Sequence, residues 1–272
     1  MTVLDDIIVG VKEDMEGRRA QVSLEELKDR VAGVAPARDA WGALGGPASD
    51  RNDLKVIAEI KRRSPSKGDL ASIADPASLA VQYADGGASV ISVLTEQRRF
   101  GGSLADLDAV RAAVETPLLR KDFTVDEYQI WEARAHGADL ILLIVAALTD
   151  AELARFSALS HELGMSVLVE THTEEEIERA VAAGARIIGI NVRNLKTLDV
   201  DRSVFGSLAG LIPAGAVVVA ESGVRGADDV AHYAANGANA ILVGEALVSD
   251  STPRERITEF KAAGAAAIAV RN

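Results

Sequence analysis

The chain has 272 residues, 48% of them hydrophobic and 26% charged, with a formal net charge of -12 at pH 7. This balance is typical of a folded, water-soluble protein with a large core. The acidic charge disfavours general binding to nucleic acid or to anionic membranes, and the lack of cysteine excludes disulfides, thiol nucleophiles and cysteine metal sites. The chain shows neither a membrane-spanning apolar run nor a signal-peptide pattern, so we expect a cytoplasmic protein.

Residues 1–50 are expected to form a helical extension, followed by a catalytic domain at 51–272. Apolar residues fall on one helical face over 3–15, and Ser23 followed by Glu26 has the spacing of a capping box for a second helix. Residues 33–50, rich in Gly, Ala and Pro, are predicted to be a linker. The pattern leaves open whether the helices plug the bottom of the domain or cover its substrate site.

From Lys55 onward, short apolar runs of β type alternate with segments of helical period. Helices are predicted, for example, over 76–85 and 173–183. Alternation of this kind favours a parallel sheet. The runs predicted to be strands are 56–60, 89–94, 117–121, 139–145, 166–170, 186–191, 216–221 and 240–244.

A glycine precedes each even-numbered strand, and each is expected to take a left-handed conformation at the end of a helix. The glycines are separated by 50, 47 and 53 residues and are Gly87, Gly137, Gly184 and Gly237. A fourfold recurrence of a double strand-helix unit indicates a closed ring rather than a doubly wound open sheet. We therefore predict an α/β fold, a single (β/α)8 TIM barrel with an N-terminal helical extension.

Ionisable side chains recur at the ends of the odd-numbered strands. Side chains alternate between the faces of a strand, so Glu59 and Lys61 share a face with Ile57, and the purely apolar face is expected to contact the helices. Active sites of such barrels lie at the C-terminal ends of the strands. We expect one small volume to receive Glu59, Lys61, Lys121, Glu170 and Glu221, with Asn191 and Arg193 from an even-numbered strand.

Two interpretations fit this convergence: ion pairs that close the barrel top, or a catalytic cluster. Buried charges are costly unless they are paired or take part in function. The convergence of so many ionisable groups therefore favours catalysis. A lysine beside carboxylates suits proton donation, and a nearby carboxylate suits proton removal. The four histidines, His136, His161, His172 and His232, show no metal-ligand spacing.

Two segments indicate an anionic ligand. After strand 56–60, three basic residues surround Ser64, an unusual concentration of positive charge in an acidic chain. Glycines also follow the last two strands, in ESGVRG at 221–226 and LVGEAL at 242–247. Phosphate usually binds there in this fold, which makes the backbone N–H groups of Gly223, Gly244 and Glu245 candidate donors, with the Glu245 side chain turned away.

Seven ordered segments resemble the strand ends of the indole-3-glycerol phosphate synthase family: AEIKRRSPSKG, SVLTEQRRFGGS, LLRKDF, LVETH, GINVRNL, AESGV and LVGEAL. They cover about residues 55–250. The chain departs from the family pattern at Arg63, Glu96 and Val192, the last of which bears on how Asn191 and Arg193 are held. The resemblance implies ring closure of 1-(2-carboxyphenylamino)-1-deoxyribulose 5-phosphate, with loss of carbon dioxide and water, in tryptophan biosynthesis. It implies no metal or organic cofactor, because the substrate's ketone serves as electron sink.

The resemblance also implies residue roles. Lys121 is the general acid at the ketone oxygen, Lys61 lies next to the substrate carboxylate, and Glu59 positions it. Glu170, Glu59 and both lysines are candidates for the elimination step, and the division of acid roles between the lysines stays open. The implied catalytic set is Glu59, Lys61, Lys121, Glu170, Asn191 and Glu221. The implied substrate-binding set is Ser64, Phe123, Arg193, Leu195, Ser222, Gly223, Gly244 and Glu245.

Three alternatives share some of these features. A phosphoribosylanthranilate isomerase-like or other phosphosugar-binding barrel has a similar phosphate site, but the isomerase calls for a catalytic cysteine that this chain lacks. A Schiff-base aldolase would use Lys61 or Lys121 as nucleophile. A non-catalytic scaffold barrel would bind ligand without turnover. The expected partner is a phosphorylated small molecule, not nucleic acid or membrane, and the oligomeric state is left open, a monomer included.

Overall fold

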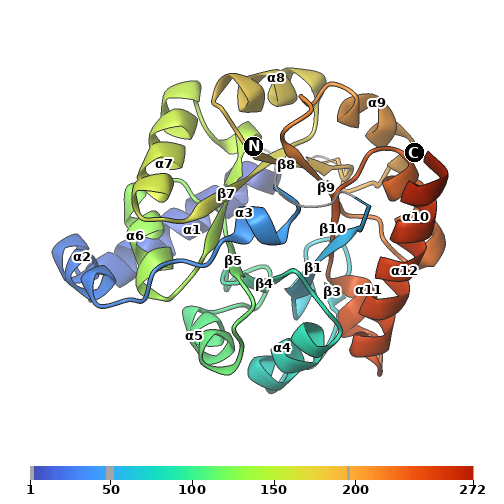
Figure 1. The fold of residues 1–272 in the computed structure, drawn as a ribbon. Coiled ribbons are helices and arrows are strands. Elements are labelled where there is room, and N and C mark those ends of the chain that lie inside the picture. The colour runs from blue at the N-terminus through green and yellow to red at the C-terminus, as the bar shows by residue number, and fades with distance from the viewer. Residues whose placement is uncertain (1–2, 47–51, 195–196, 272) are drawn as a thin grey trace.

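The computed structural model describes residues 3–46, 52–194 and 197–271, and a closed barrel of parallel strands forms its centre (Figure 1). The strand order around the barrel is β1-β10-β9-β8-β7-β6-β5-β4. The predicted (β/α)8 barrel is therefore confirmed. The strands are β1 (Lys55–Ile60), β4 (Val90–Leu94), β5 (Leu118–Lys121), β6 (Leu140–Ile144), β7 (Ser166–Thr171), β8 (Ile187–Asn191), β9 (Val217–Glu221) and β10 (Ala240–Val243).

Helices surround the barrel and connect its strands. Several begin at a short polar residue whose side chain accepts a hydrogen bond from the first turn, as Asp75, Ser103 and Thr173 do. The helices of the ring are α4 (Pro76–Asp85), α5 (Leu104–Ala113), α6 (Glu127–Ala135), α7 (Asp150–Glu162), α8 (Glu174–Ala182), α9 (Phe205–Ala209), α10 (Ala227–Ala235), α11 (Glu245–Val248) and α12 (Pro253–Arg271), with 3-10 turns η1 (Val145–Ala147) and η2 (Arg202–Val204).

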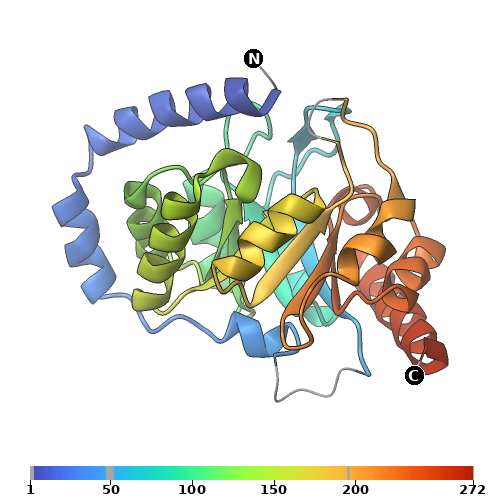
Figure 2. The ribbon, with the colours of Figure 1, turned by 90° about the horizontal axis from the view of Figure 1, so that it is seen from above.

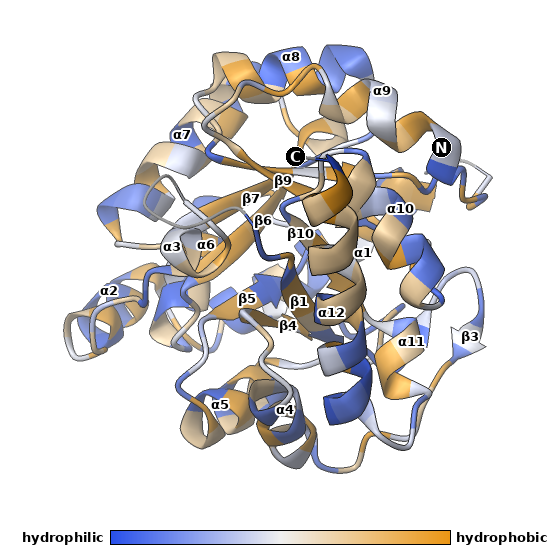
Figure 3. Cartoon of the chain, turned by 45° about the vertical axis from the view of Figure 1, so that its right-hand side comes forward, coloured by the Kyte–Doolittle hydropathy of each residue, from blue (hydrophilic) through white to orange (hydrophobic). Residues whose placement is uncertain are grey.

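Two apolar layers result from the alternation of side chains along the strands. Val56, Ala58 and Ile60 of β1 pack in the outer layer between strands and helices. The inner layer fills the barrel and includes Ile57, together with Leu119, Leu168 and Val219, which precede the site residues of β5, β7 and β9 by two positions. Figure 3 shows the hydrophobic colouring that runs along the barrel strands. The predicted assignment of faces is thus correct.

The recurring glycines take the conformation that the sequence predicts. The φ angles of Gly87, Gly137, Gly184 and Gly237 are 84°, 78°, 75° and 105°. L-residues with a side chain rarely adopt this left-handed region, whereas glycine does so at little cost. Each glycine ends a helix and turns the chain into an even-numbered strand of the ring.

The N-terminal extension contacts both ends of the barrel. Its helices are α1 (Val3–Arg19), α2 (Leu24–Ala32) and α3 (Ala40–Ala43), and Figure 2 shows α1 and α3 on opposite sides of the strands. Residues of α1 line the cavity at the C-terminal strand ends, whereas Ala40 and Leu44 pack into the inner layer at the other end. Of the two predicted helices, α1 thus lies at the cavity and α2 packs against α6, whereas the opposite end of the barrel is closed by α3, a helix that was not predicted.

The predicted linker is wrong at residues 40–43, which form α3. Asp39 caps this short helix by accepting a hydrogen bond from Gly42, so the Ala- and Gly-rich composition hid a local helix signal. The expected boundary between residues 50 and 51 lies outside the described residues. The capping box of α2 between Ser23 and Glu26 is confirmed.

Arginines tie α1 to the barrel. Arg18 donates to Glu132 of α6 at 2.7 Å, and Glu132 in turn accepts from the buried Arg120 of β5 at 2.8 Å. At its other side, α1 presents Glu13 and Asp14 to Arg98, with N–O distances of 2.8 and 2.7 Å. These contacts hold the helix across the barrel mouth.

The loop after β1 carries an antiparallel ribbon of two short strands, β2 (Arg63–Ser64) and β3 (Gly68–Asp69). Arg62, at the base of this loop, pairs with Asp106 of α5 at 2.5 Å. The ribbon therefore projects beside the mouth of the barrel. Among the described helices, none is both long and apolar enough to cross a membrane.

Candidate active site

A cavity of about 440 Å³ opens at the C-terminal ends of the barrel strands. Of the predicted site residues, Leu195 lies outside the described part of the chain. All the others line this cavity: Glu59, Lys61, Ser64, Lys121, Phe123, Glu170, Asn191, Arg193, Glu221, Ser222, Gly223, Gly244 and Glu245.

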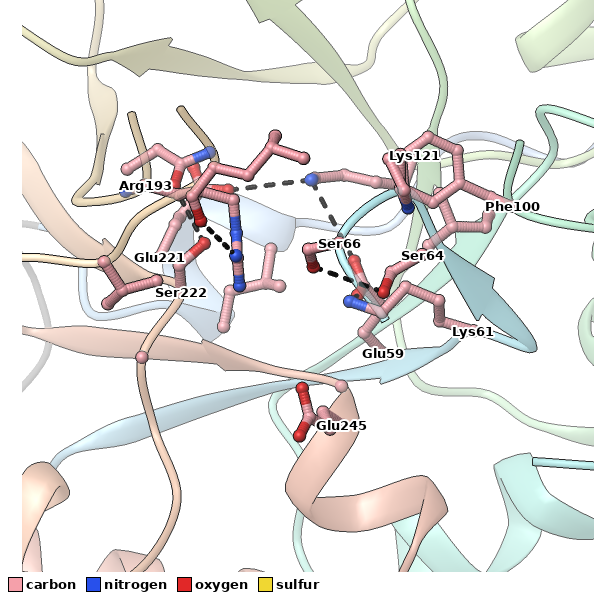
Figure 4. A pocket seen from close by; sticks show the side chains of 18 of the residues that line it. Glu59, Lys61, Ser64, Ser66, Phe100, Lys121, Arg193, Glu221, Ser222 and Glu245 are labelled. Carbon is pink, nitrogen blue, oxygen red and sulfur yellow. Dashed lines mark hydrogen bonds and ion pairs between the residues drawn. The ribbon is translucent and has the colours of Figure 1, made fainter. Parts of the chain in front are cut away.

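The Lys121 ammonium lies among three carboxylates at the base of the cavity (Figure 4). Its Nζ is 3.7 Å from Glu170 Oε2, 3.7 Å from Glu221 Oε2 and 3.9 Å from Glu59 Oε2. The carboxylates come from β7, β9 and β1, so three odd-numbered strands converge on the end of a fourth. The side chain of Lys121 is 16% exposed and those of the carboxylates no more than 4%, so this cluster is largely removed from bulk water.

Lys61 forms a second, closer ion pair. Its Nζ lies 2.7 Å from Glu59 Oε1, on the side of that carboxylate away from Lys121. Gly244 at the end of β10 makes room for this pair, since a Cβ there would lie 2.6 Å from Glu59 Oε1. Glu59 is therefore held between two lysines.

A hydrogen-bonded chain links β7, β8 and β9. Asn191 Nδ2 donates to Glu170 Oε1 at 3.1 Å, and Asn191 Oδ1 accepts from Ser222 Oγ at 2.8 Å and from the backbone N–H of Arg193 at 3.1 Å. The Arg193 guanidinium donates to the carbonyl of Leu198 at 2.8 Å. Asn191 thus orients Glu170 and fixes the start of the loop that carries Arg193.

Burial and charge set the protonation of the cluster. Burial lowers the pKa of Lys121, but Glu170, Glu221 and Glu59 outweigh it and hold the pKa above its ordinary value. Burial raises the pKa of Glu59 and of Glu170, but nearby cations lower both below the usual range: Lys61 and Lys121 for Glu59, Lys121 and His172 for Glu170. The cluster therefore holds a charged lysine beside ionised carboxylates at neutral pH.

Glu221 differs from the other two carboxylates. Burial, followed by the negative charge of Glu170, raises the pKa of Glu221 well above its usual range. Its Oε1 has no hydrogen-bond partner among the described residues. Gly189 of β8 provides the space for this oxygen, since a Cβ at position 189 would lie 2.0 Å away from it. Burial and Glu170 thus favour the protonated form of Glu221 more than that of the other two carboxyl groups, and its Oε1 is unpaired among the described residues.

The end of β9 makes a strained turn at the other side of the cavity. Ser222 has a φ of 70°, unusual for a residue with a side chain, and Gly223 follows with a φ of 80°. The Ser222 carbonyl accepts from Tyr233 at 3.1 Å and the Gly223 carbonyl from Arg202 Nε at 2.6 Å. The surrounding contacts therefore hold the turn in this conformation.

The Glu245 side chain turns towards the loop after β1. Its Oε1 accepts from Lys67 Nζ at 2.5 Å. This agrees with the expectation that the side chain would leave the backbone N–H groups at the start of α11 unobstructed. The contact also brings one of the basic residues around Ser64 to the glycine-rich end of the cavity.

Several lining residues were not found from the sequence. Phe100 packs against Phe123 with ring centroids 6.0 Å apart, and Arg202 comes from η2. Val3, Leu4 and Ile7 of α1 also line the cavity. An amphipathic stripe marked α1 as a packed helix, but no sequence signal specified the surface on which it packs. Among the described residues, no group of three or more His, Asp or Glu side chains is placed to hold a metal ion.

The fold and this site define a class: a (β/α)8-barrel enzyme with an acid-base cluster of lysines and carboxylates at the C-terminal strand ends. A family model described as "Indole-3-glycerol phosphate synthase" matches residues 4–260. The chain belongs to the indole-3-glycerol phosphate synthase family.

Relatives that match along nearly the whole chain support this assignment. The indole-3-glycerol phosphate synthase of Paenarthrobacter aurescens is 91% identical over 272 residues, which cover 100% of both chains. That of Micrococcus luteus is 61% identical over 263 residues, 97% of this chain and 98% of the relative. Among solved structures, 3-hexulose-6-phosphate synthase from Salmonella typhimurium has a TM-score of 0.60 at 14% identity, covering 80% of this chain and 100% of that one. This last similarity shows the fold alone.

Proposed function

We infer that this chain is a decarboxylating lyase that closes the ring of 1-(2-carboxyphenylamino)-1-deoxyribulose 5-phosphate to form indole-3-glycerol phosphate, a step of tryptophan biosynthesis. The observation that carries the assignment of roles is the position of Lys121, a largely buried cation within 3.9 Å of three carboxyl groups. A site built only to bind an anion has no need of three carboxylates around its cation. Proton transfer needs both kinds of group.

Ring closure places negative charge on the substrate ketone oxygen. The aromatic carbon that bears the carboxylate forms a bond to the ketone carbon, and the oxygen takes a proton. We assign this proton to Lys121, because its carboxylate neighbours keep it charged and the cavity leaves it accessible to ligand. Removal from bulk water strengthens the interaction between the ammonium group and the developing oxyanion.

Loss of carbon dioxide returns the electron pair of the broken bond to the aromatic ring. The hydroxyl made in the first step then leaves as water, which requires a proton on the hydroxyl and removal of a proton from the adjacent carbon. Glu170 is our candidate for the base, because it is ionised and oriented by Asn191. Lys61, fixed by Glu59 at 2.7 Å, is another basic side chain that lines the cavity and the candidate acid for this step.

Substrate binding uses the two sides of the cavity. We propose that Lys61 and Arg193 attract the substrate carboxylate and that Phe123, with Phe100 beside it, packs against the aromatic ring. The phosphate is assigned to the turn at Ser222 and Gly223 and to the N–H groups after Gly244, with Ser64 and its basic neighbours on the facing loop. Leu195 remains a proposed contact.

The proposed partner is therefore a phosphorylated small molecule, and the acidic chain is proposed to act in the cytoplasm without nucleic acid or membrane as partner. We also propose that the reaction needs no metal or organic cofactor. The substrate's own ketone accepts the electrons that ring closure moves.

Lys121→Met tests the assignment of the general acid. It should lower kcat by at least about 10²-fold, while binding of a phosphate-ester product analogue, measured by calorimetry, changes little. Lys12→Met, an exposed lysine of α1, is the matched control. Near wild-type kcat in Lys121→Met would show that another group supplies the proton.

Two rival activities give different results. A Schiff-base aldolase would be trapped on Lys61 or Lys121 by borohydride in the presence of substrate, with a mass increase on that lysine. A scaffold barrel would bind the substrate and never form indole product. Turnover without trapping excludes both.

A further inference from the structure

His172 lies directly behind Glu170, outside the set of side chains that line the cavity. Its Nε2 is 3.4 Å from Glu170 Oε1, and its Nδ1 is 3.1 Å from Glu176 Oε2 at the start of α8. The same Glu176 oxygen accepts from the backbone N–H of His172 at 2.7 Å. The imidazole is thus fixed between a structural carboxylate and a site carboxylate, with 10% of its side chain exposed.

The two oxygens of Glu170 have different cationic neighbours. Lys121 lies on the Oε2 side, where Glu59 and Glu221 share it. On the Oε1 side the neighbours are the neutral amide of Asn191, which donates at 3.1 Å, and the imidazole of His172. A charged imidazole would therefore supply this side of the carboxylate with its own cation.

Five elements present polar or charged side chains to the pair. Glu176 comes from α8, Lys121 from β5, Asn191 from β8, Glu221 from β9 and Glu59 from β1. The imidazole thus lies beside a group of largely buried carboxyl side chains, two of which, Glu59 and Glu170, nearby cations favour in the ionised form. Loss of an imidazolium charge at His172 would remove one of the cations that compensate them, which burial disfavours.

Electrostatics agree with this geometry. Burial lowers the pKa of His172, but its contacts with Glu170 and Glu176 outweigh burial and raise the pKa to about 10. The Nε2 atom has no hydrogen bond among the described residues, so its contact with Glu170 is one of charge rather than of a well-aligned hydrogen bond. Such a contact depends on protonation of the ring.

We propose that His172 is a positioning residue for the reaction: as an imidazolium held by Glu176, it keeps Glu170 ionised and in place. It does not touch the reacting atoms. The proposal rests on the role assigned to Glu170 as base. It follows that the lower pH limit of turnover is set in part by a residue behind the cavity.

His172→Gln tests the proposal through the pH dependence of kcat. Glutamine keeps hydrogen-bonding capacity but removes the charge, so the pKa of Glu170 rises and its base form is lost at a higher pH. The acidic limb of the kcat profile should move up by about one pH unit or more, since an opposite charge within about 4–6 Å lowers a carboxyl pKa by about that amount. Above the limb, kcat should recover towards the wild-type value, and KM should stay nearly constant.

His161→Gln is the matched control. His161 lies beside Trp41 and Arg186, close to α3 at the other end of the barrel. Its replacement should leave the acidic limb unchanged. A drop in kcat of equal size at every pH in His172→Gln would show a purely structural role and overturn the proposal, as would an unmoved limb.

NMR tests the charge of His172 without relying on activity. In protein labelled with 13C at the histidine Cε1 position, the signal missing from His172→Gln identifies His172, and its shift should remain that of an imidazolium through pH 8. Glu176→Gln should lower its titration midpoint. A titration midpoint of His172 below pH 7 in the wild-type protein would overturn the proposal, whatever role Glu170 has. The role of Glu170 as base is tested separately by the loss of activity in Glu170→Gln.

Discussion

Replacement of Gly189 by alanine tests how closely the site is built around Glu221. The added Cβ would lie 2.0 Å from Glu221 Oε1 and 3.2 Å from Leu168 Cδ1. Heavy atoms in contact favour separations of about 3.5 Å, so the Glu221 carboxyl must retreat by about 1 Å or more. Its Oε1 has no hydrogen-bond partner among the described residues, so the side chain moves in preference to β8.

This displacement should affect activity more than folding. Misplacement of a site group by about 1 Å costs about 10²-fold in rate, whereas insertion of a methyl group into a packed interior costs about 1–3 kcal/mol. We expect the kcat of Gly189→Ala to fall by about 10²-fold, where kcat is measured as the rate of indole product formation at saturating substrate. The urea midpoint should fall only modestly.

Two further variants make the test specific. Gly17→Ala adds a methyl group on the exposed side of α1, where nothing lies within 4 Å of it, and should leave kcat unchanged. If the effect at Gly189 acts through Glu221, then Gly189→Ala combined with Glu221→Ala should be no slower than Glu221→Ala alone. Full activity in Gly189→Ala, or additive losses in the double variant, would refute the reasoning.

Glu132→Gln removes a buried carboxylate beside Arg120 and should lower the free energy of unfolding by about 3–5 kcal/mol at pH 7. Burial raises the pKa of Glu132, but Arg120 and Arg18 lower it below its usual value, so its stabilisation is present above the unfolded-state pKa and lost as the pH falls. The difference in urea midpoint from wild type should therefore shrink below about pH 4, and a constant difference would contradict this. Arg98→Ala frees α1 from its contact at Glu13 and should raise KM with little change in kcat; an unchanged KM would show that α1 covers the cavity without this contact.

The barrel was predictable because its signals are local and repeated. Apolar runs of strand length alternated with helical segments, and the glycines before even-numbered strands marked the turns. The face of each site side chain followed from the period of two along a strand, as for Glu59 beside Ile57. Convergence at one end then followed from the parallel arrangement, since every strand contributes its C-terminal end to the same edge.

What the sequence could not specify depends on contacts between distant segments. The stripe on α1 indicated burial but not the partner surface, and the helix α3 was hidden in a segment with linker-like composition. The raised pKa of Glu221 arises from burial and from the negative charge of Glu170, which lies on another strand. His172 is an exception, since its partners Glu170 and Glu176 are close to it in the sequence, but no motif in this segment indicated that the three side chains meet.

The central claim is that the carboxylate-lysine cluster catalyses ring closure. Its most direct test is the rise in indole fluorescence when 1-(2-carboxyphenylamino)-1-deoxyribulose 5-phosphate is added to the purified protein, with Glu170→Gln measured alongside. The account predicts a rise with the wild-type chain that is lost in the variant, although the variant still binds the substrate. Equal rises in both would contradict the role of Glu170, and no rise in the wild-type chain with bound substrate would contradict the activity itself.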